Sequence, residues 1–273
     1  GTFEQPFVDP DLPIASIHSL NKINFLRGNN QELLVTRESR PDMVLESDEA
    51  LSLSPGSYEA ARAAASCALS GAYVLVEGKE GLVYALCRPP GHHATREKAG
   101  GYCLFSNATL AAKHLRDMGR SKVAILDIDI HHGNGTQEII YDEPDILFAS
   151  LNGANIYPHG NNEIRDWKQY PTLTTPNILN ISIEPWTNDF NYLCCVDSAI
   201  DWIKSAGAAA IVVSAGFDTS VKERKDLFEY ERGFELWKKF GLAEDCYRKI
   251  GQRLHETKLP ILAIQEGGYN PEY

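Results

Sequence analysis

The sequence lacks the features that would place it in an oxidising compartment or a membrane. Its six cysteines include no Cys-x-x-Cys pair, which excludes a zinc knuckle and a thioredoxin-like motif, and we expect free thiols. No apolar run reaches the roughly 20 residues that a membrane-spanning helix needs, and residues 1–10 do not resemble a signal peptide. We therefore expect a cytoplasmic protein without a membrane partner.

Positive charge is also scarce in this chain. It has 26 Lys and Arg against 37 Asp and Glu, a formal net charge of −11, and no clear Lys/Arg run of the nuclear-localisation type. Because nucleic acids and anionic lipids are polyanions, this balance disfavours a general role on either and mildly favours cationic ligands such as amines. We expect no direct nucleic-acid partner.

The chain does contain what a globular domain needs. With 273 residues and 43% apolar composition it can bury a substantial core without disulfides, and we treat residues 1–273 as a single domain. Helical periodicity alternates with short apolar runs, which is typical of an α/β fold with a mostly parallel central sheet flanked by helices. We predict helices at 57–76, 106–118, 136–141, 190–205 and 231–256, and strands at 82–86, 123–127, 146–151, 178–183, 209–214 and 261–265.

Polar side chains follow several of these predicted strands. Parallel strands end at one edge of a sheet, where ligands of open α/β folds bind, so we expect these side chains to meet there. They are His92, His93, the segment 127–132, Ser150, Asp218 and Tyr269.

The segment 127–135 is the most informative part of this set. On an extended chain Asp127, Asp129 and His131 point to one side, and Asp218 ends a second apolar strand. If those strands are neighbours, Asp218 completes an Asp/His/Asp set of three ligands. Catalytic zinc is held by three protein ligands and a water, so the pattern predicts a catalytic metal rather than a structural one.

Two further motifs supply groups that could move protons. His92 and His93 lie on a proline-stiffened loop, where both can face one cleft, and histidine titrates near neutral pH. Tyr269 follows two glycines at the end of the last strand, so its phenol could donate to a developing oxyanion.

Taken together, these motifs resemble the zinc-dependent histone deacetylase superfamily, which includes the bacterial acetylpolyamine amidohydrolases. The class II deacetylases and their bacterial relatives are the most similar, and the resemblance implies an arginase/deacetylase-type fold. It rests on six ordered motifs: RPPGHHA (88–94), GGYCLFSN (100–107), DIDIHHGNGT (127–136), ASL (149–151), SAGFDT (214–219) and EGGYN (266–270).

The resemblance implies a role for each site residue. It implies zinc ligands Asp129, His131 and Asp218; an acid/base pair, His92 and His93, oriented by Asp127 and Asn134; a carbonyl-polarising Tyr269; and channel walls at Gly101, Tyr102 and Tyr157. It also implies a structural potassium ion at Asp127, Asp129, His131, Ser150 and Leu151. The implied reaction is removal of acetyl groups from acetylated amines, either acetyl-lysine in proteins and peptides or acetylpolyamines. Some relatives narrow the channel by dimerising, so the resemblance leaves open whether this protein is a homo-oligomer.

Several departures and rivals accompany this interpretation. The family carries more chain before the His-His motif and after Gly-Gly-Tyr, so we expect termini or loops to be incomplete here. Residues 221–225 replace a Gly-Asp-Pro turn and would bring basic residues to the rim.

A binuclear manganese ureohydrolase is the nearest alternative function, but Gly133 and Ser220 stand where its extra carboxylates would be. A catalytically silent acetyl-lysine binding module is the non-enzymatic alternative.

Overall fold

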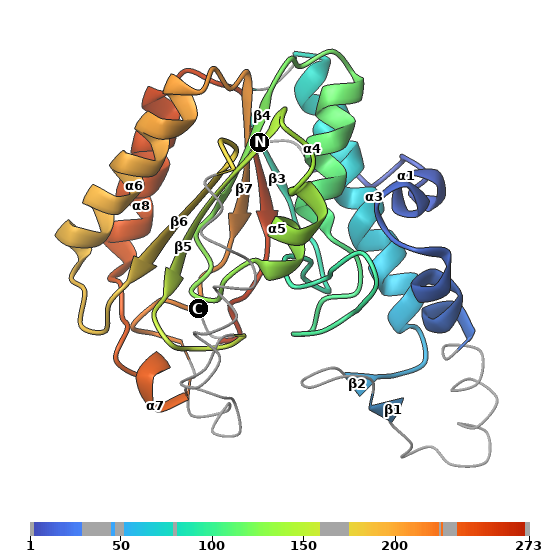
Figure 1. The fold of residues 1–273 in the computed structure, drawn as a ribbon, viewed down its shortest axis with the longest axis horizontal. Helices are drawn as coiled ribbons and strands as arrows, with labels where there is room; N and C mark the ends of the chain where they lie inside the picture. Colours follow the sequence, from blue (N-terminus) through green and yellow to red (C-terminus); the bar gives the residue numbers. More distant parts are fainter. Residues whose placement is uncertain are drawn as a thin grey trace.

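The computed structural model describes residues 3–28, 45–46, 52–78, 81–158, 175–223, 225 and 234–270. Within these ranges a six-stranded parallel sheet has the order β3-β8-β7-β4-β5-β6 (Figure 1). The strands are β3 (Leu82–Ala85), β4 (Val123–Asp127), β5 (Ile146–Gly153), β6 (Ile178–Ile183), β7 (Ala210–Ala215) and β8 (Ile261–Gln265). The expected α/β class with a parallel sheet is confirmed.

Helices cover both faces of this sheet (Figure 1). One face packs against α3 (Ser57–Val76) and α4 (Asn107–Asp117), and the other against α6 (Asp189–Ser205) and α8 (Glu244–Glu256). Outside α3 and α4 lie α1 (Asp11–Ile17) and a helix at 20–28, which form a third apolar cluster with them. The shorter elements are α5 (Asn134–Ile140), α7 (Phe234–Trp237), β1 (Leu45–Glu46) and β2 (Ser52–Leu53). Among the described helices, none combines the length and apolarity required to cross a membrane.

One predicted helix, 231–256, is wrong. The structure has the short α7 and then α8, and residues 238–243 between them are not helical. The backbone of Leu242 instead bonds to the loop after β7: its N–H donates to Thr219 O and its carbonyl accepts from Val221 N. Gly241 lies in this break, and the pairing with a loop 20 residues away was not visible in the periodicity. Residues 231–233 lie outside the described part.

The predicted metal ligands lie near the carboxyl end of β4, which has a central position in the sheet. All five of its residues are buried, as expected for a strand covered on both faces. In the register, Asp127 at its carboxyl end lies beside Ser150 of β5 and Ser214 of β7. The loops that leave β4 and β7 therefore start side by side, and they carry the predicted metal ligands.

We predict that Leu115→Ala destabilises the protein by about 2–5 kcal/mol, because Leu115 is fully buried between α4 and the sheet and its removal leaves a cavity. The matched change Leu12→Ala should stay within about 0.5 kcal/mol, since Leu12 of α1 is 85% exposed. Urea unfolding monitored by circular dichroism measures the change in the free energy of unfolding for both variants. Equal effects at the two positions would contradict this assignment of the core.

Candidate active site

Two carboxylates and an imidazole meet where β4 and β7 end. The Nδ1 atom of His131 lies 3.1 Å from Asp129 Oδ1 and 2.9 Å from Asp218 Oδ2. One ligand atom from each of the three residues can be chosen so that all lie within 4.8 Å of one another, and the three residues are buried. The structure thus brings together the three residues that the sequence predicted as metal ligands.

The charges in this cluster fit a cation. Burial alone would lower the pKa of His131, but Asp218 and Asp129 outweigh it and raise that pKa well above its usual value. In the absence of metal the imidazole therefore holds a proton between two carboxylates. A divalent ion would take the place of that proton, and a two-carboxylate, one-imidazole set suits zinc with a position left for water.

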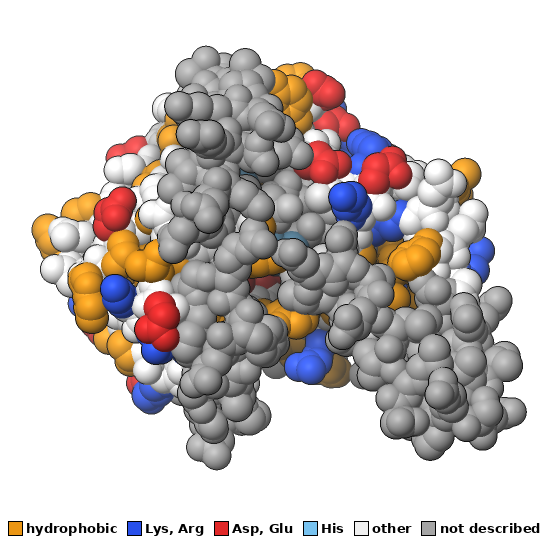
Figure 2. Space-filling model, turned by 60° about the horizontal axis from the view of Figure 1, so that its bottom comes forward, with side chains coloured by type: hydrophobic (Ala, Val, Ile, Leu, Met, Phe, Trp, Pro, Cys, Tyr) orange, Lys and Arg blue, Asp and Glu red, His pale blue; other side chains and the backbone are white. Residues whose placement is uncertain are grey.

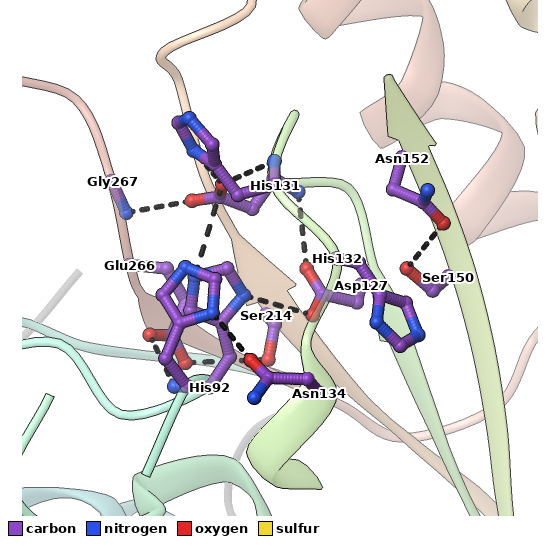
Figure 3. Close-up of polar contacts among 12 residues, drawn as sticks. His92, Asp127, His131, His132, Asn134, Ser150, Asn152, Ser214, Glu266 and Gly267 are labelled. Carbon is purple, nitrogen blue, oxygen red and sulfur yellow. Dashed lines mark hydrogen bonds and ion pairs between the residues drawn. The ribbon is translucent and has the colours of Figure 1, made fainter. Parts of the chain in front are cut away.

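The backbone orients both carboxylates. Asp129 accepts a hydrogen bond from Gly267 N at 2.9 Å (Figure 3) and another from His131 N at 2.9 Å. Asp218 accepts one from Ile130 N at 3.1 Å. Partners of this kind fix the direction in which ligating groups point. The segment after β8 therefore supports the cluster together with the segment after β4.

Trp237 also contacts the candidate metal ligands, a contact that no pattern in the sequence indicates. Its Nε1 donates to Asp218 O at 3.1 Å, and its ring lies 5.0 Å from that of His131. The residue is on α7, the short helix that the sequence pattern merged into a longer one.

The two adjacent histidines lie beside the cluster, with ring centroids 4.0 Å apart. His92 Nδ1 lies 3.1 Å from Asp127 Oδ2, and His93 Nδ1 lies 2.8 Å from Asn134 Oδ1 (Figure 3). Because both partner atoms are acceptors, each Nδ1 is the donor, and the other ring nitrogen is the one left to accept or release a proton.

The surroundings shift the pKa values of the two histidines in opposite directions. Burial alone would lower the pKa of His92, but Asp129 and Asp127 reverse this and raise the pKa to about 10. Burial lowers the pKa of His93 well below its usual value, and the nearby His92 and His131 lower it further. In the metal-free protein these shifts favour the protonated form of His92 and the neutral form of His93.

Glu266 anchors the loop that carries both histidines. Its Oε2 accepts from Gly91 N at 2.7 Å and from His92 N at 3.1 Å, and its Oε1 accepts from Ser214 Oγ at 3.3 Å. Burial raises the pKa of Glu266 to about 7. The sequence had marked Glu266 only as part of a motif, although an acid next to a diglycine at a strand end was a usable signal.

A second anchor comes from the N-terminal part of the chain. Lys22 Nζ donates to Thr95 O at 2.8 Å, and His18 accepts from Ser106 N at 2.9 Å through Nε2. Burial lowers the pKa of Lys22 to about 7. Neither residue stood out in the sequence, because no pattern in that region links them to a loop more than 70 residues away.

Aromatic residues border the histidines. The Tyr157 ring lies 4.9 Å from that of His93 and 6.1 Å from that of His131, and the Tyr102 ring lies 5.9 Å from that of Tyr269. Gly101 has φ +52°, and a Cβ there would come within 2.4 Å of the His93 ring. Only glycine permits this approach, so the backbone at 101 forms one side of the site.

The residues predicted to hold potassium are neighbours in the structure. Asp127 lies beside Ser150 across the β4–β5 register, Leu151 follows, and Asp127 Oδ1 accepts from Asp129 N at 3.1 Å. Ser150 Oγ donates to Asn152 Oδ1 at 3.3 Å (Figure 3). The potassium ion itself stays a prediction.

The face onto which the strands open is turned forward in Figure 2, where histidine surface shows only as small pale-blue patches. This agrees with exposures of 3% for His92 and 6% for His93. The expected basic rim is wrong for Lys225, which is buried and donates to Phe240 O. Lys222 is exposed but forms an ion pair with Glu244.

Known proteins resemble this chain along most of its length. The sequence pattern of the histone deacetylase domain matches residues 10–273. Acetylpolyamine amidohydrolase of Mycoplana ramosa is 37% identical over 80% of this chain and 60% of its own, and histone deacetylase 8 of Arabidopsis thaliana is 32% identical over 81% and 58%. This chain thus spans less than two thirds of the length of either relative.

A solved structure agrees with the sequence matches. The crystal structure of acetylpolyamine aminohydrolase from Burkholderia pseudomallei superimposes with a TM-score of 0.79 at 27% identity, covering 98% of this chain and 81% of that one. The fold, the ordered motifs and these matches lead to one assignment: the chain belongs to the histone deacetylase domain family.

Proposed function

We propose that this protein is a zinc-dependent amidohydrolase that removes acetyl groups from acetylated amines. The observation that carries the proposal is the buried Asp129/His131/Asp218 cluster next to a histidine pair whose Nδ1 atoms are held by Asp127 and Asn134. A divalent ion held by these three residues would supply Lewis-acid polarisation of a carbonyl, and the adjacent neutral imidazole can take a proton from the attacking water.

The protein's own residues divide the proton transfers. His93 is neutral, and with Nδ1 held by Asn134 its Nε2 can act as the base. His92 keeps its proton beside Asp127, so it contributes positive charge near the developing oxyanion and can return a proton to the departing amine. Zinc, held by Asp129, His131 and Asp218, would supply Lewis-acid polarisation. Tyr269 would donate its phenol hydrogen to the acetyl oxygen.

The aromatic residues would bind the rest of the substrate. Gly101, Tyr102 and Tyr157 line the approach to the histidines and would hold the apolar arm between the acetyl group and the remainder of the molecule. A potassium ion at the Asp127 and Ser150 segment would offset the buried carboxylates behind the histidines.

Acetylpolyamines are the substrate class we propose. The net charge of −11 favours cationic amines, and relatives in Mycoplana ramosa and Pseudomonas aeruginosa carry the name acetylpolyamine amidohydrolase. Acetyl-lysine in proteins would use the same chemistry. A cytoplasmic location and a homo-oligomeric state belong to the proposal as well.

The binuclear ureohydrolase alternative meets a steric obstacle. It needs a carboxylate two residues after His131, where this chain has Gly133. A Cβ at that position would lie 2.3 Å from Asp127 Oδ2, so no side chain fits there without displacing the partner of His92.

The first test compares turnover of N-acetylputrescine, N-acetylspermidine and an acetyl-lysine peptide by the zinc-loaded protein. We expect kcat/KM to be higher for the two polyamines, and we expect His93→Ala to abolish turnover because it removes the base. A preference for the peptide would instead indicate a protein deacetylase. Zinc binding without turnover of any acetylated amine would favour the silent binding module.

We predict that zinc affinity rises with pH. Because the raised pKa of His131 keeps it protonated in the metal-free protein, zinc must displace that proton, and affinity should rise about tenfold per pH unit. Burial raises the pKa of Asp218 to about 6, so zinc affinity should decrease more steeply with falling pH below that value. Competition with a chelator between about pH 5 and pH 8 measures this.

Two variants control the zinc measurement. Asp218→Asn should weaken zinc binding, and Asp201→Asn, at an exposed position on α6, should leave it unchanged. A pH-independent affinity in the parent protein would contradict a protonated cluster.

We predict that Tyr269→Phe lowers kcat by about 10²-fold or more with little change in KM, because a phenol that donates to the oxyanion acts in the transition state. Steady-state kinetics on the best acetylated amine tests this. Tyr73→Phe, on the partly exposed surface of α3, should retain full activity. A Tyr269→Phe enzyme as fast as the parent would remove Tyr269 from the mechanism.

A further inference from the structure

The segment that carries Tyr269 is hydrogen-bonded to the loop after β7, which also carries Asp218. At the start of this segment, Gly267 O accepts from Phe217 N at 2.8 Å. Further along it, the side chain of Glu223 reaches across, and its Oε2 accepts from Tyr269 N at 2.7 Å. One loop thus carries a candidate metal ligand and also holds the backbone of the tyrosine.

The backbone before Tyr269 cannot fix the direction of the tyrosine by itself. Gly267 and Gly268 precede it, and Gly268 has φ +129°, a region that glycine enters at no steric cost. Glycine also has more conformational freedom than any other residue. A tyrosine that follows two glycines therefore needs a contact at its own backbone to keep one conformation. The carboxylate of Glu223 supplies that contact, and a carboxylate is a stronger acceptor than a neutral group.

The turn that presents Glu223 is itself attached to another part of the fold. Val221 N donates to Leu242 O at 3.1 Å, in the break between α7 and α8. Lys222 forms an ion pair with Glu244, which lies in the first turn of α8. The Glu223 side chain therefore extends from a turn that has a defined position relative to α8.

Two attachment points set the direction of the phenol. Gly267 N donates to Asp129, one of the candidate metal ligands, so the start of the segment is fixed to the cluster (Figure 3). The bond to Glu223 fixes the segment two residues later. Between these points lies a single glycine, and the Tyr269 ring that follows packs against the core and lies 5.9 Å from the Tyr102 ring. Loss of the second point would leave the metal ligands in place and free the tyrosine to turn.

We propose that Glu223 is a positioning residue for Tyr269: its carboxylate holds the backbone N–H of the tyrosine so that the phenol stays directed at the acetyl oxygen. Glu223 acts through Tyr269 and makes no contact with the substrate itself. This inference rests on the proposed function, in which Tyr269 donates to the oxyanion. When the carboxylate is removed, the bond from Phe217 N and the bond from Asn270 Nδ2 to Lys222 O still attach the segment, so the change is one of direction and not of folding.

Steady-state kinetics of three variants tests this role. Glu223→Ala should lower kcat about tenfold with little change in KM, because a misdirected donor is missed in the transition state. Glu223→Gln keeps an acceptor of the same length and should stay within about threefold of the parent. The matched control Glu244→Gln, which removes only the ion pair of the same turn, should retain full activity. An unchanged kcat in Glu223→Ala, or an equal loss in Glu244→Gln, would overturn the proposal.

A double-mutant cycle tests whether Glu223 acts through Tyr269. In the Tyr269→Phe background the donor is already absent, so Glu223→Ala should cost less than about twofold in kcat. Zinc affinity, measured by chelator competition, should be the same in Glu223→Ala and in the parent, because Asp218 keeps its place. An equal loss of kcat in both backgrounds, or weakened zinc binding, would show that Glu223 supports the site by another route and would contradict the proposal.

Nitration by tetranitromethane tests the positioning without any turnover. The full 273-residue chain of each variant is treated at mildly alkaline pH, and the modified tyrosines are identified by peptide mass spectrometry. Tyr269 should react several-fold faster in Glu223→Ala than in the parent or in Glu223→Gln, whereas Tyr73, 38% exposed on α3, should react equally in all three. Equal reaction of Tyr269 in the three proteins would overturn the positioning role. If nitration responds but no acetylated amine is hydrolysed, the proposed function fails while the role of Glu223 in holding Tyr269 stands.

Discussion

The structure depends on the compensation of negative charge that is buried at the carboxyl edge of the sheet. Asp127, Asp129, Asp218 and Glu266 are at most 5% exposed, and carboxylates at that depth are costly unless they are paired. The loops after β3, β4 and β8 supply the compensation through imidazoles and backbone N–H groups. The same pairing sets the protonation of the histidines, so the conformation of the loops and the chemistry of the site have one electrostatic origin.

Much of this was predictable from the sequence because its determinants are local. The buried strand at 123–127 is an uninterrupted apolar run, and the alternation of such runs with helices requires a parallel sheet. A parallel sheet brings its strand ends to one edge, so the proximity of Asp129, His131 and Asp218 followed from topology without any knowledge of distances.

What the sequence left undetermined depends on contacts between distant segments. The break between α7 and α8 forms because Leu242 pairs with the loop after β7, and Trp237 thereby contacts Asp218. Lys22 and His18 support a loop from another part of the chain. Periodicity describes how one segment faces its surroundings, and it contains no information about which segment becomes its partner.

The position of β4 between β5 and β7 has a consequence for how the protein tolerates change. Asp129, His131 and Asp218 lie in loops that follow central strands of the sheet. Their arrangement is lost only when the core unfolds, because a central strand separates from its neighbours only when the whole sheet opens. Substitutions that weaken the core should therefore reduce the fraction of folded molecules, while each folded molecule keeps the geometry of the Asp129/His131/Asp218 cluster. Substitutions at core positions would therefore be selected through their effect on the amount of folded protein. Only substitutions in the loops would be selected through their effect on the chemistry of the site.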